Sequence, residues 1–291
     1  MPRHDDPNLY RRRLRDALRT AREAQHLTQR QAAEDLDWSM SKLVRIEAGT
    51  VNVSTTDLKA LLQLYAIEDE TRVGNLLEIA RNTRRSPWYS KYQDVIGASF
   101  AEFLGYERSA ATIKAFTQLI IPGLVQTDDY ARAILEIRRV TRIDERVELR
   151  MERQELLDQE DCPEIFYVID EAALHRQVGG AATMRRQLRR LKEAMDHPKI
   201  SVEIIPFSAG AHPSMSSSFT VLEFADWDED VLYQETTQGS VTTRENQDQV
   251  AEYIERFDLL RAMSLGGQDA IDLVDRLLDD LTTAHQTNKQ E

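Results

Sequence analysis

Residues 27–49 read LTQRQAAEDLDWSMSKLVRIEAG and contain the signals for two short helices joined by a tight turn. Thr28 and Gln31 have the spacing of a capping box, in which each side chain accepts a hydrogen bond from the other residue's backbone N–H group. A helix is therefore predicted to begin at Gln29. Its inward face would consist of Ala32, Ala33 and Leu36, and the two alanines would let a second helix approach closely.

The second helix of the pair is predicted to follow a turn at Asp37, where a positive φ is common and Asp tolerates it better than most residues. Ser39 is the expected N-cap and Gly49 the expected stop. Leu43 and Ile46 are three residues apart and would face inward. The side chains that point away from that face are Met40, Ser41, Lys42, Val44 and Arg45.

Side chains on the outer face of such a second helix are those that a DNA major groove would meet. Arg45 could bridge guanine O6 and N7, Ser41 could exchange hydrogen bonds with several bases, and Met40 could contact a thymine methyl group. Lys42 and Gln29 are predicted to contact phosphate. The alternative is an ordinary helical hairpin whose polar face is merely solvated.

The pattern LTQxxxAxxL, followed by S and then LxRIExG, resembles the Xre type of Cro and lambda-repressor-like regulators. This resemblance implies that Arg22 of the preceding helix pairs with Glu47 of the RIE triplet. It implies DNA contacts by Gln29 on phosphate and by Met40, Ser41 and Arg45 at base edges. The chain departs from the pattern at Asp37, where glycine is frequent, and at Met40, where a polar reader is frequent.

The charges of the chain are distributed unevenly. The 291 residues have a net charge of −13, yet residues 1–86 carry 15 Lys and Arg against 13 Asp and Glu, and the remainder carries 22 against 37. Positive charge gathers beside the helix pair at Arg3, Arg11, Arg12, Arg13, Arg15, Arg19 and Arg22. Phosphate contact requires such a cluster, although a solvated arginine-rich helix would account for some of these residues.

The amino-acid composition limits where the protein is expected to reside and which kinds of site it can contain. The chain is 41% apolar and 30% charged, which is typical of a folded soluble protein with room for two domains. A single cysteine, Cys162, excludes an internal disulfide and a cysteine-based metal cluster. The N-terminus lacks the apolar core of a signal peptide, and no apolar run approaches ~20 residues. We therefore expect a cytoplasmic protein with no membrane span, no metal and no cofactor.

The order of elements predicts the α+β class, with two domains and a tail. Residues 1–86 would form a lambda-repressor-like domain of five helices, over about 8–25, from 29, over 40–48, from 54 and over about 69–82. Pro87 marks the boundary. Residues 87–284 would form a mixed-sheet domain with strands at 113–121, 165–170, 200–207, 218–224, 231–235 and 240–243. Its flanking helices are predicted at about 88–104, 127–135, 144–159, 181–195, 246–263 and 267–284, and residues 285–291 as a frayed tail.

Several segments of the second half, PWYSKYQ, IPGLVQTDDYARAIL, ERQELL, IDEAALHRQVGG, IPFSAGAHP and SFTVLEF, resemble the C-terminal domain of the WhiJ-like regulators of actinobacteria. The resemblance implies an antitoxin-like transcription regulator that acts with a small acidic partner protein encoded nearby.

One short recognition helix buries too little surface to be specific alone. We therefore expect a homodimer, joined through its second half, on a two-fold double-stranded DNA operator.

A hydrolase tethered to DNA is an alternative from another class of function. Asp170, Glu171, His175 and Arg176 follow a predicted strand and His212 lies in a loop, so these residues could form an acid/base pair or a metal site. The chain has no HExxH, GxSxG or P-loop spacing, and Asp170 with Glu171 is typical of a helix start. We therefore assign no catalytic residue and expect a protein that is not an enzyme.

A small-molecule-sensing transcription factor is the remaining alternative. A ligand pocket could be lined by Trp88, Tyr92, Phe166, Phe207 and His212. The aromatic members of this set would otherwise simply belong to the hydrophobic core. The sequence thus predicts a DNA-binding transcription regulator whose second domain receives either a protein partner or a small molecule.

Overall fold

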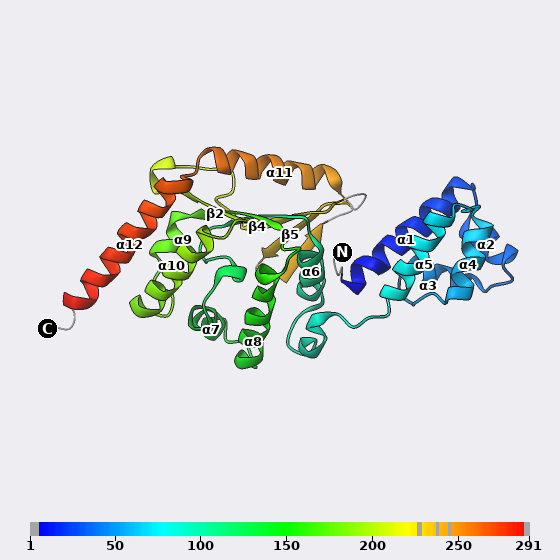
Figure 1. The fold of residues 1–291 in the computed structure, drawn as a ribbon, viewed down its shortest axis with the longest axis horizontal. Coiled ribbons are helices and arrows are strands. Elements are labelled where there is room, and N and C mark those ends of the chain that lie inside the picture. Colours follow the sequence, from blue (N-terminus) through cyan, green and yellow to red (C-terminus); the bar gives the residue numbers. More distant parts are fainter. Residues whose placement is uncertain (1–5, 226–228, 237–238, 244–245, 288–291) are drawn as a thin grey trace. The chain divides into compact units, whose positions relative to one another are not determined.

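A computed structural model describes residues 6–225, 229–236, 239–243 and 246–287. The chain divides into two compact units, Met1–Ser90 and Lys91–Glu291, of which the first is helical and the second contains a mixed sheet (Figure 1). The predicted α+β class is therefore confirmed, with a helical N-terminal region followed by a mixed sheet and flanking helices.

The first unit consists of short capped helices. They are α1 (Pro7–Ala24), α2 (Gln29–Asp35), α3 (Met40–Glu47), α4 (Thr55–Leu64) and α5 (Glu70–Asn82). Each begins after a side chain that accepts a hydrogen bond from a first-turn N–H group, and these caps are Asp6, Thr28, Ser39, Ser54 and Asp69. A cap of this kind typically contributes ~1 kcal/mol, so local chemistry specifies where the helices begin.

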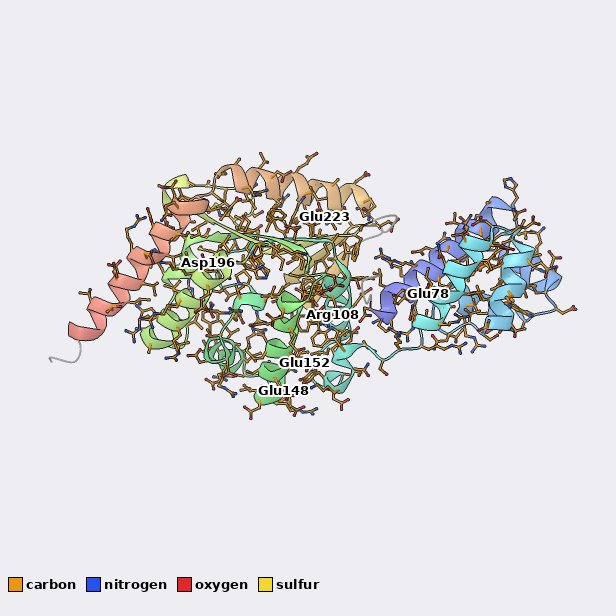
Figure 2. The ribbon with its side chains drawn as sticks, viewed as in Figure 1. Glu78, Arg108, Glu148, Glu152, Asp196 and Glu223 are labelled. Atoms are coloured by element: carbon orange, nitrogen blue, oxygen red, sulfur yellow. The ribbon has the colours of Figure 1, made fainter. Side chains whose placement is uncertain are left out.

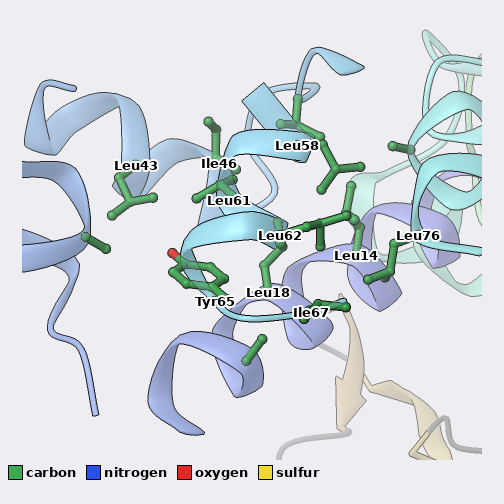
Figure 3. Packing of buried hydrophobic residues seen from close by; sticks show 14 of the residues in the cluster. Leu14, Leu18, Leu43, Ile46, Leu58, Leu61, Leu62, Tyr65, Ile67 and Leu76 are labelled. Atoms are coloured by element: carbon green, nitrogen blue, oxygen red, sulfur yellow. The ribbon is translucent and has the colours of Figure 1, made fainter. Parts of the chain in front are cut away.

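Buried side chains from all of these helices meet in one core (Figure 3). Leu18 of α1, Leu43 of α3 and Leu61 of α4 are fully buried. Ala32 and Ala33 of α2 are buried too, and their small side chains permit the close contact between α2 and α3. Burying one leucine stabilises by roughly 1.5–3 kcal/mol, so the core rather than the caps holds the helices together.

The described residues of the second unit form a six-stranded sheet in the order β3-β2-β1-β4-β5-β6. Its strands are β1 (Thr112–Thr117), β2 (Glu164–Asp170), β3 (Ile200–Ile205), β4 (Phe219–Glu223), β5 (Val231–Thr236) and β6 (Gly239–Thr243). The strands β1, β2 and β3 pair in parallel, whereas β4, β5 and β6 continue the sheet in antiparallel pairs. Helices connect the parallel strands, because a parallel pair needs a long crossover.

Helices cover both faces of this sheet (Figure 1). They are α6 (Ala98–Ser109), α7 (Asp128–Ile137), α8 (Ile143–Gln154), α9 (Glu171–His175), α10 (Ala181–Met195), α11 (Gln247–Ala262) and α12 (Gly267–Thr287). The helix α11 lies on one face, above a core that includes Phe116, Val168 and Phe257. The helices α7, α8 and α10 lie on the other face. Successive strand residues point to opposite faces, so each strand contributes to both layers.

Some element boundaries differ from those expected. Instead of one helix over 88–104, a 3-10 helix η1 (Trp88–Tyr92) is followed by the separate α6, because the chain is extended at Gly97. The strand β1 ends at Thr117 rather than at 121, and β3 ends before Pro206, which has no N–H group to donate to a neighbouring strand.

Two helix ends also differ. After α8, residues 155–158 continue as a 3-10 helix η3 (Glu155–Asp158) rather than as part of the α-helix. The last helix continues through Thr287, three residues into the segment expected to be frayed, and residues 288–291 lie outside the described part of the chain.

Candidate functional site

The helix pair α2–α3 has the local chemistry that its sequence predicts. The Thr28 hydroxyl accepts from Gln31 N at 3.2 Å, and Gln31 Oε1 accepts from Thr28 N at 2.9 Å. Asp37 has a φ of 54° in the turn, and Gly49 has a φ of 68° after α3. The Ser39 hydroxyl caps α3 by accepting from Lys42 N at 3.3 Å. The predicted beginnings of both helices are therefore confirmed.

The outer face of α3 is exposed and chemically mixed. Met40 is 46% exposed and Val44 37% exposed, although both are apolar. Ser41 and Arg45 are exposed on the same face, and Arg45 Nε donates to the Ser41 carbonyl at 3.2 Å. The opposite face, with Leu43 and Ile46, is buried in the core. The three predicted base readers are thus all accessible, and Val44 joins them as a fourth accessible side chain that had no assigned role.

Lys42 differs from these residues because its charge already has a partner. Its Nζ donates to Asp57 Oδ1 of α4 at 2.7 Å and lies 3.7 Å from the centre of the Trp38 ring. Burial by itself raises the pKa of Asp57, but the hydrogen bonds from Lys42 and Ser54 outweigh it and the pKa is lowered. A phosphate at this position would therefore compete with Asp57 for the ammonium group.

Arg22 and Glu47 form a buried ion pair that joins α1 to α3. Arg22 Nε lies 2.9 and 3.0 Å from the two Glu47 carboxylate oxygens, and the two side chains are 9% and 2% exposed. Tyr65 Oη donates to Glu47 Oε1 at 3.1 Å, and Gln29 Nε2 donates to Oε2 at 2.9 Å. Burial and the Glu47 charge raise the pKa of Tyr65, so its hydroxyl remains a donor. The network fixes α3 against three neighbouring segments.

Gln29 therefore has a positioning role as well as its predicted phosphate contact. One hydrogen of its side-chain amide is used by Glu47. A primary amide has two such hydrogens, so the second can still reach a phosphate oxygen. A phosphate bound there would be linked through Gln29 to the buried ion pair.

The arginines of α1 are not all available for phosphate contact. The sequence had suggested that they were, because several of them lie close together beside the helix pair. Arg12 and Arg22 are buried. Two others pair with acidic neighbours, as Arg15–Asp16 and Arg19–Glu23. Arg3 lies outside the described residues. Much of the apparent positive charge on this helix is thus structural or neutralised, because sequence spacing alone does not show which arginines are covered.

The second unit brings His212 and Asp170 together at the end of β2. His212 Nε2 lies 3.2 Å from Asp170 Oδ2, and His212 Nδ1 accepts from Ser214 N at 3.3 Å. Asp170 Oδ1 also caps α9 by accepting from Ala172 N at 2.8 Å. The His212 side chain is 5% exposed and both of its ring nitrogens are engaged. This arrangement anchors the loop that follows β3 to the end of β2.

Two further candidates for chemistry, Glu171 and His175, lie in α9, directly after the end of β2. His175 lies 3.0 Å from Glu171 within α9, and Glu171 Oε2 accepts from Phe207 N at 2.7 Å. These contacts hold the residues after β3 in place. Among the described residues, no group of three or more His, Cys, Asp or Glu side chains is arranged to hold a metal ion.

Of the five residues predicted to line a ligand pocket, the four that belong to the second unit have separate contacts. Tyr92 donates to Glu152 of α8 at 2.7 Å, on one side of the sheet (Figure 2). Phe166 packs on the side covered by α11, where the Arg261 guanidinium lies 5.0 Å from its ring centre. Phe207 is 59% exposed. Trp88 belongs to the first unit and His212 anchors a loop. These contacts give the side chains different surroundings, and the ligand pocket stays a prediction for this set.

A different cavity lies in the second unit and was not anticipated. It has a volume of about 40 Å³ and is lined by apolar side chains together with Arg146, Arg150 and Arg153 of α8. The spacing of these arginines, four and then three residues apart, places them on one face of a helix. In the sequence, this spacing could have indicated a shared arginine-lined site. A highly charged helix, however, more often exposes such a face to solvent.

Comparison with known families gives two matches. A helix-turn-helix domain matches residues 13–73, which contain α2 and α3. A domain of unknown function (DUF5753) matches residues 100–276, which is more than half of the chain. No curated protein and no solved structure matches the chain. None of the described helices combines the length and the apolar character needed to cross a bilayer. The chain therefore belongs to the family that contains the domain of unknown function DUF5753, here preceded by a helix-turn-helix domain.

Proposed function

We propose that this protein is a sequence-specific transcription regulator of the Xre type that places α3 in the major groove of an operator. The observation that carries the proposal is the exposed face of α3, which offers Arg45, Ser41 and two apolar side chains while its other face is buried. The match to a helix-turn-helix domain supports DNA binding. The buried Arg22–Glu47 pair supports it further, because a reading helix must be held rigidly.

The proposed DNA contacts fall into two classes, those to bases and those to phosphates. Arg45, Ser41 and Met40 read bases, with Arg45 the strongest candidate because a guanidinium can bridge two acceptors of guanine. Gln29 and Lys42 contact phosphate and set the position of the helix without reading sequence. Val44 lies between the base readers on the exposed face, so it supplies a further apolar contact for a thymine methyl group.

A binding-site selection with the full chain tests the base-reading class. Replacing Arg45 by Ala should cost ~1–3 kcal/mol on the preferred site and relax preference at one base pair. The matched control is Arg72→Ala, which removes an exposed arginine of α5 outside the helix pair. If Arg45→Ala keeps the parent's base preference, α3 is not the reading helix in this register.

Lys42 and Asp57 give a test of the phosphate class. Lys42→Ala should weaken all DNA sequences alike and reduce the slope of log K against log salt by ~0.9. Asp57→Asn should have the opposite effect, because it frees the Lys42 ammonium and removes a negative charge. A salt slope that neither variant changes would show that Lys42 contacts no phosphate.

We further propose that the protein binds as a homodimer through its second unit, with half-sites ~10 bp apart or a multiple of that spacing. The resemblance of this unit to the WhiJ-like regulators supports an antitoxin-like role in the cytoplasm. Sedimentation with and without an operator tests the dimer, which a monomer in both conditions would exclude.

The same resemblance supports a small acidic partner protein for the second unit. This part of the chain is itself acidic overall, so such a partner needs a local basic surface. Arg185 and Arg189 of α10 lie four residues apart on one helix face, and within the described part of the chain neither has an acidic partner. Charge reversal at both positions should abolish co-elution with the product of the neighbouring reading frame, and unchanged co-elution would place the partner elsewhere.

A second candidate function, a ligand-controlled regulator, is favoured by the arginine-lined cavity of the second unit. Catalysis is a weaker alternative, because both ring nitrogens of His212 are engaged and Asp170 caps α9, so this pair holds the chain in place where β2 ends. We therefore propose that the second unit receives a signal rather than carries out a reaction.

A further inference from the structure

We infer that the cavity beside α8 binds a small ionised carboxylic acid whose body is apolar. Its charged lining comes from one face of α8, through Arg146, Arg150 and Arg153. Its apolar lining comes from Ile96, Phe100, Leu135 and Leu149. All of these residues belong to the second unit, so the inference does not depend on the proposal that the first unit binds DNA.

Arg153 lines this cavity, but its charge is already neutralised by an acidic side chain of the protein. Its Nε and one terminal nitrogen each lie 2.5 Å from the carboxylate oxygens of Glu107, whose side chain is buried. The guanidinium also lies 5.3 Å from the centre of the Phe103 ring. Because a buried acid and an aromatic ring already satisfy Arg153, it contributes shape more than free charge.

Arg150 and Arg146 are different, because no carboxylate among the described residues pairs with either. Arg150 donates to Gln126 Oε1 at 2.6 Å, and Arg146 Nε donates to the Thr141 carbonyl at 3.0 Å. Both partners are neutral. The acid whose charge acts on Arg150 is Glu235, but Glu235 is half-exposed and pairs with Arg138 at 3.3 Å. Two guanidinium charges therefore remain unmatched beside the cavity.

The environment of Arg150 is one in which an anion would be stabilising. Burial, together with the charge of Arg153, lowers the pKa of Arg150 to about 10, so the group is still charged at neutral pH. A cation that has lost water without gaining an acidic partner is costly to keep. A ligand carboxylate would supply that partner and could accept two parallel hydrogen bonds from a guanidinium.

A set of hydrogen bonds holds the residues around Arg150 in place. Gln126, which holds Arg150, is 2% exposed and donates from Nε2 to the Ile121 carbonyl at 2.6 Å. Gln154 in turn donates to the Gln126 carbonyl at 2.7 Å and to the Gly123 carbonyl at 3.2 Å. Because the loop before α7 and the end of α8 are tied together in this way, the guanidinium is positioned rather than free to rotate.

The size and lining of the cavity select among anions. The volume of about 40 Å³ exceeds the ~10–15 Å³ that one water requires, so a carboxylate group fits. Ile96 and Phe100 are partly exposed, so a ligand tail that extends toward solvent would pack on them. A bare phosphate would gain nothing from the four apolar side chains. The lining thus favours an aliphatic or aromatic monocarboxylate.

Calorimetry on the full chain tests this inference, with hexanoate and phenylacetate as probes. We expect saturable binding of one ligand per chain, no binding of the neutral isostere hexanamide and weaker binding of inorganic phosphate. Arg150→Gln should weaken binding about tenfold or more, since a hydrogen bond to a charged partner is lost. The matched control is Arg132→Gln, which removes an arginine of α7 that pairs with Asp144 outside the cavity.

A second variant addresses the apolar lining without changing charge. Ile96→Trp should fill the mouth of the cavity and weaken phenylacetate binding, even if Arg150→Gln proves too unstable to measure. Absence of binding for both probes at millimolar concentration would overturn the inference. So would equal binding of hexanamide, or an affinity that neither cavity variant changes. None of these results would affect the test of Arg45 on DNA.

Discussion

Glu47 joins three segments of the first unit through its hydrogen bonds. Its carboxylate is buried and accepts hydrogen bonds from Arg22, Gln29 and Tyr65, which come from three different segments. A buried acid whose acceptor sites are filled in this way is stable only as a complete network. Removing one member leaves an unmatched charge, so the consequence of mutation is larger than the value of any single bond.

We expect Glu47→Ala to destabilise the first unit by ~3–5 kcal/mol, because it leaves Arg22 buried without its partner. Hydrogen exchange measured by mass spectrometry on peptides from α1 and α3 would detect the change locally. Glu34→Ala is the matched control, since Glu34 belongs to an exposed pair with Arg30, and it should have little effect. Equal protection in the parent and in Glu47→Ala would show that the pair does not hold α3.

Replacing Arg150 should not lower the stability of the protein, in contrast to replacing Glu47. Because its charge is partly buried without an acidic partner in the described chain, Arg150→Gln should leave the melting temperature of the ligand-free protein unchanged or raise it. Arg153→Gln should lower it, because it would strand the buried Glu107. Differential scanning fluorimetry of the two variants checks this contrast, and a large loss of stability in Arg150→Gln would mean that the guanidinium is structural.

At the scale of elements, the turn between α2 and α3 determines the angle between these two helices. Asp37 adopts a φ of 54°, a conformation that costs other L-residues roughly 1–2 kcal/mol and glycine nothing. The caps on either side, Thr28 and Ser39, fix the beginnings of the two helices. The turn at Asp37 therefore carries backbone strain that lowers the stability of the helix pair.

Asp37→Gly should raise the stability of the first unit by up to ~1 kcal/mol, since glycine removes the strain. The same substitution two residues earlier, Asp35→Gly, should instead lower it by up to ~1 kcal/mol, because Asp35 is the last residue of α2. Thermal unfolding followed by circular dichroism gives both values. The same sign for the two substitutions would contradict the assignment of Asp37 to a strained turn.

At the scale of the whole molecule, the distribution of charge opposes DNA binding everywhere except in the first unit. Residues 1–90 contain 15 Lys and Arg against 13 Asp and Glu, whereas the chain as a whole has a net charge of −13. The second unit therefore repels DNA at long range. The proposed function therefore relies on local contacts of the first unit rather than on attraction by the whole chain.

Residues 1–90 alone should therefore bind nonspecific DNA better than the full chain at low salt. The difference should shrink at high salt, because the Debye length falls from ~30 Å at 0.01 M to ~3 Å at 1 M. A fluorescence anisotropy titration against a random duplex measures it, after circular dichroism has checked that the fragment is helical. A difference that is independent of salt would point to direct obstruction by the second unit.

The sequence by itself determined the helix pair, the exposed face of α3 and the alternation of strands and helices in the second half. These features depend on interactions within a few residues, such as the capping box of Thr28 and Gln31 or the periodicity of Leu43 and Ile46. Val44 was visible on the same face from its spacing alone.

Only the tertiary structure decided which charges are free and which aromatic residues share a cavity. Arg12 was indistinguishable in the sequence from surface arginines, yet it is buried, whereas the resemblance to Xre-type regulators had already indicated that Arg22 pairs with Glu47. The cavity unites Ile96 with Arg150, which are more than fifty residues apart in the sequence. Tyr92, in contrast, contacts α8, whereas Phe166 packs against the core beneath α11. Burial depends on contacts between residues far apart in the chain, and no local pattern specifies those contacts.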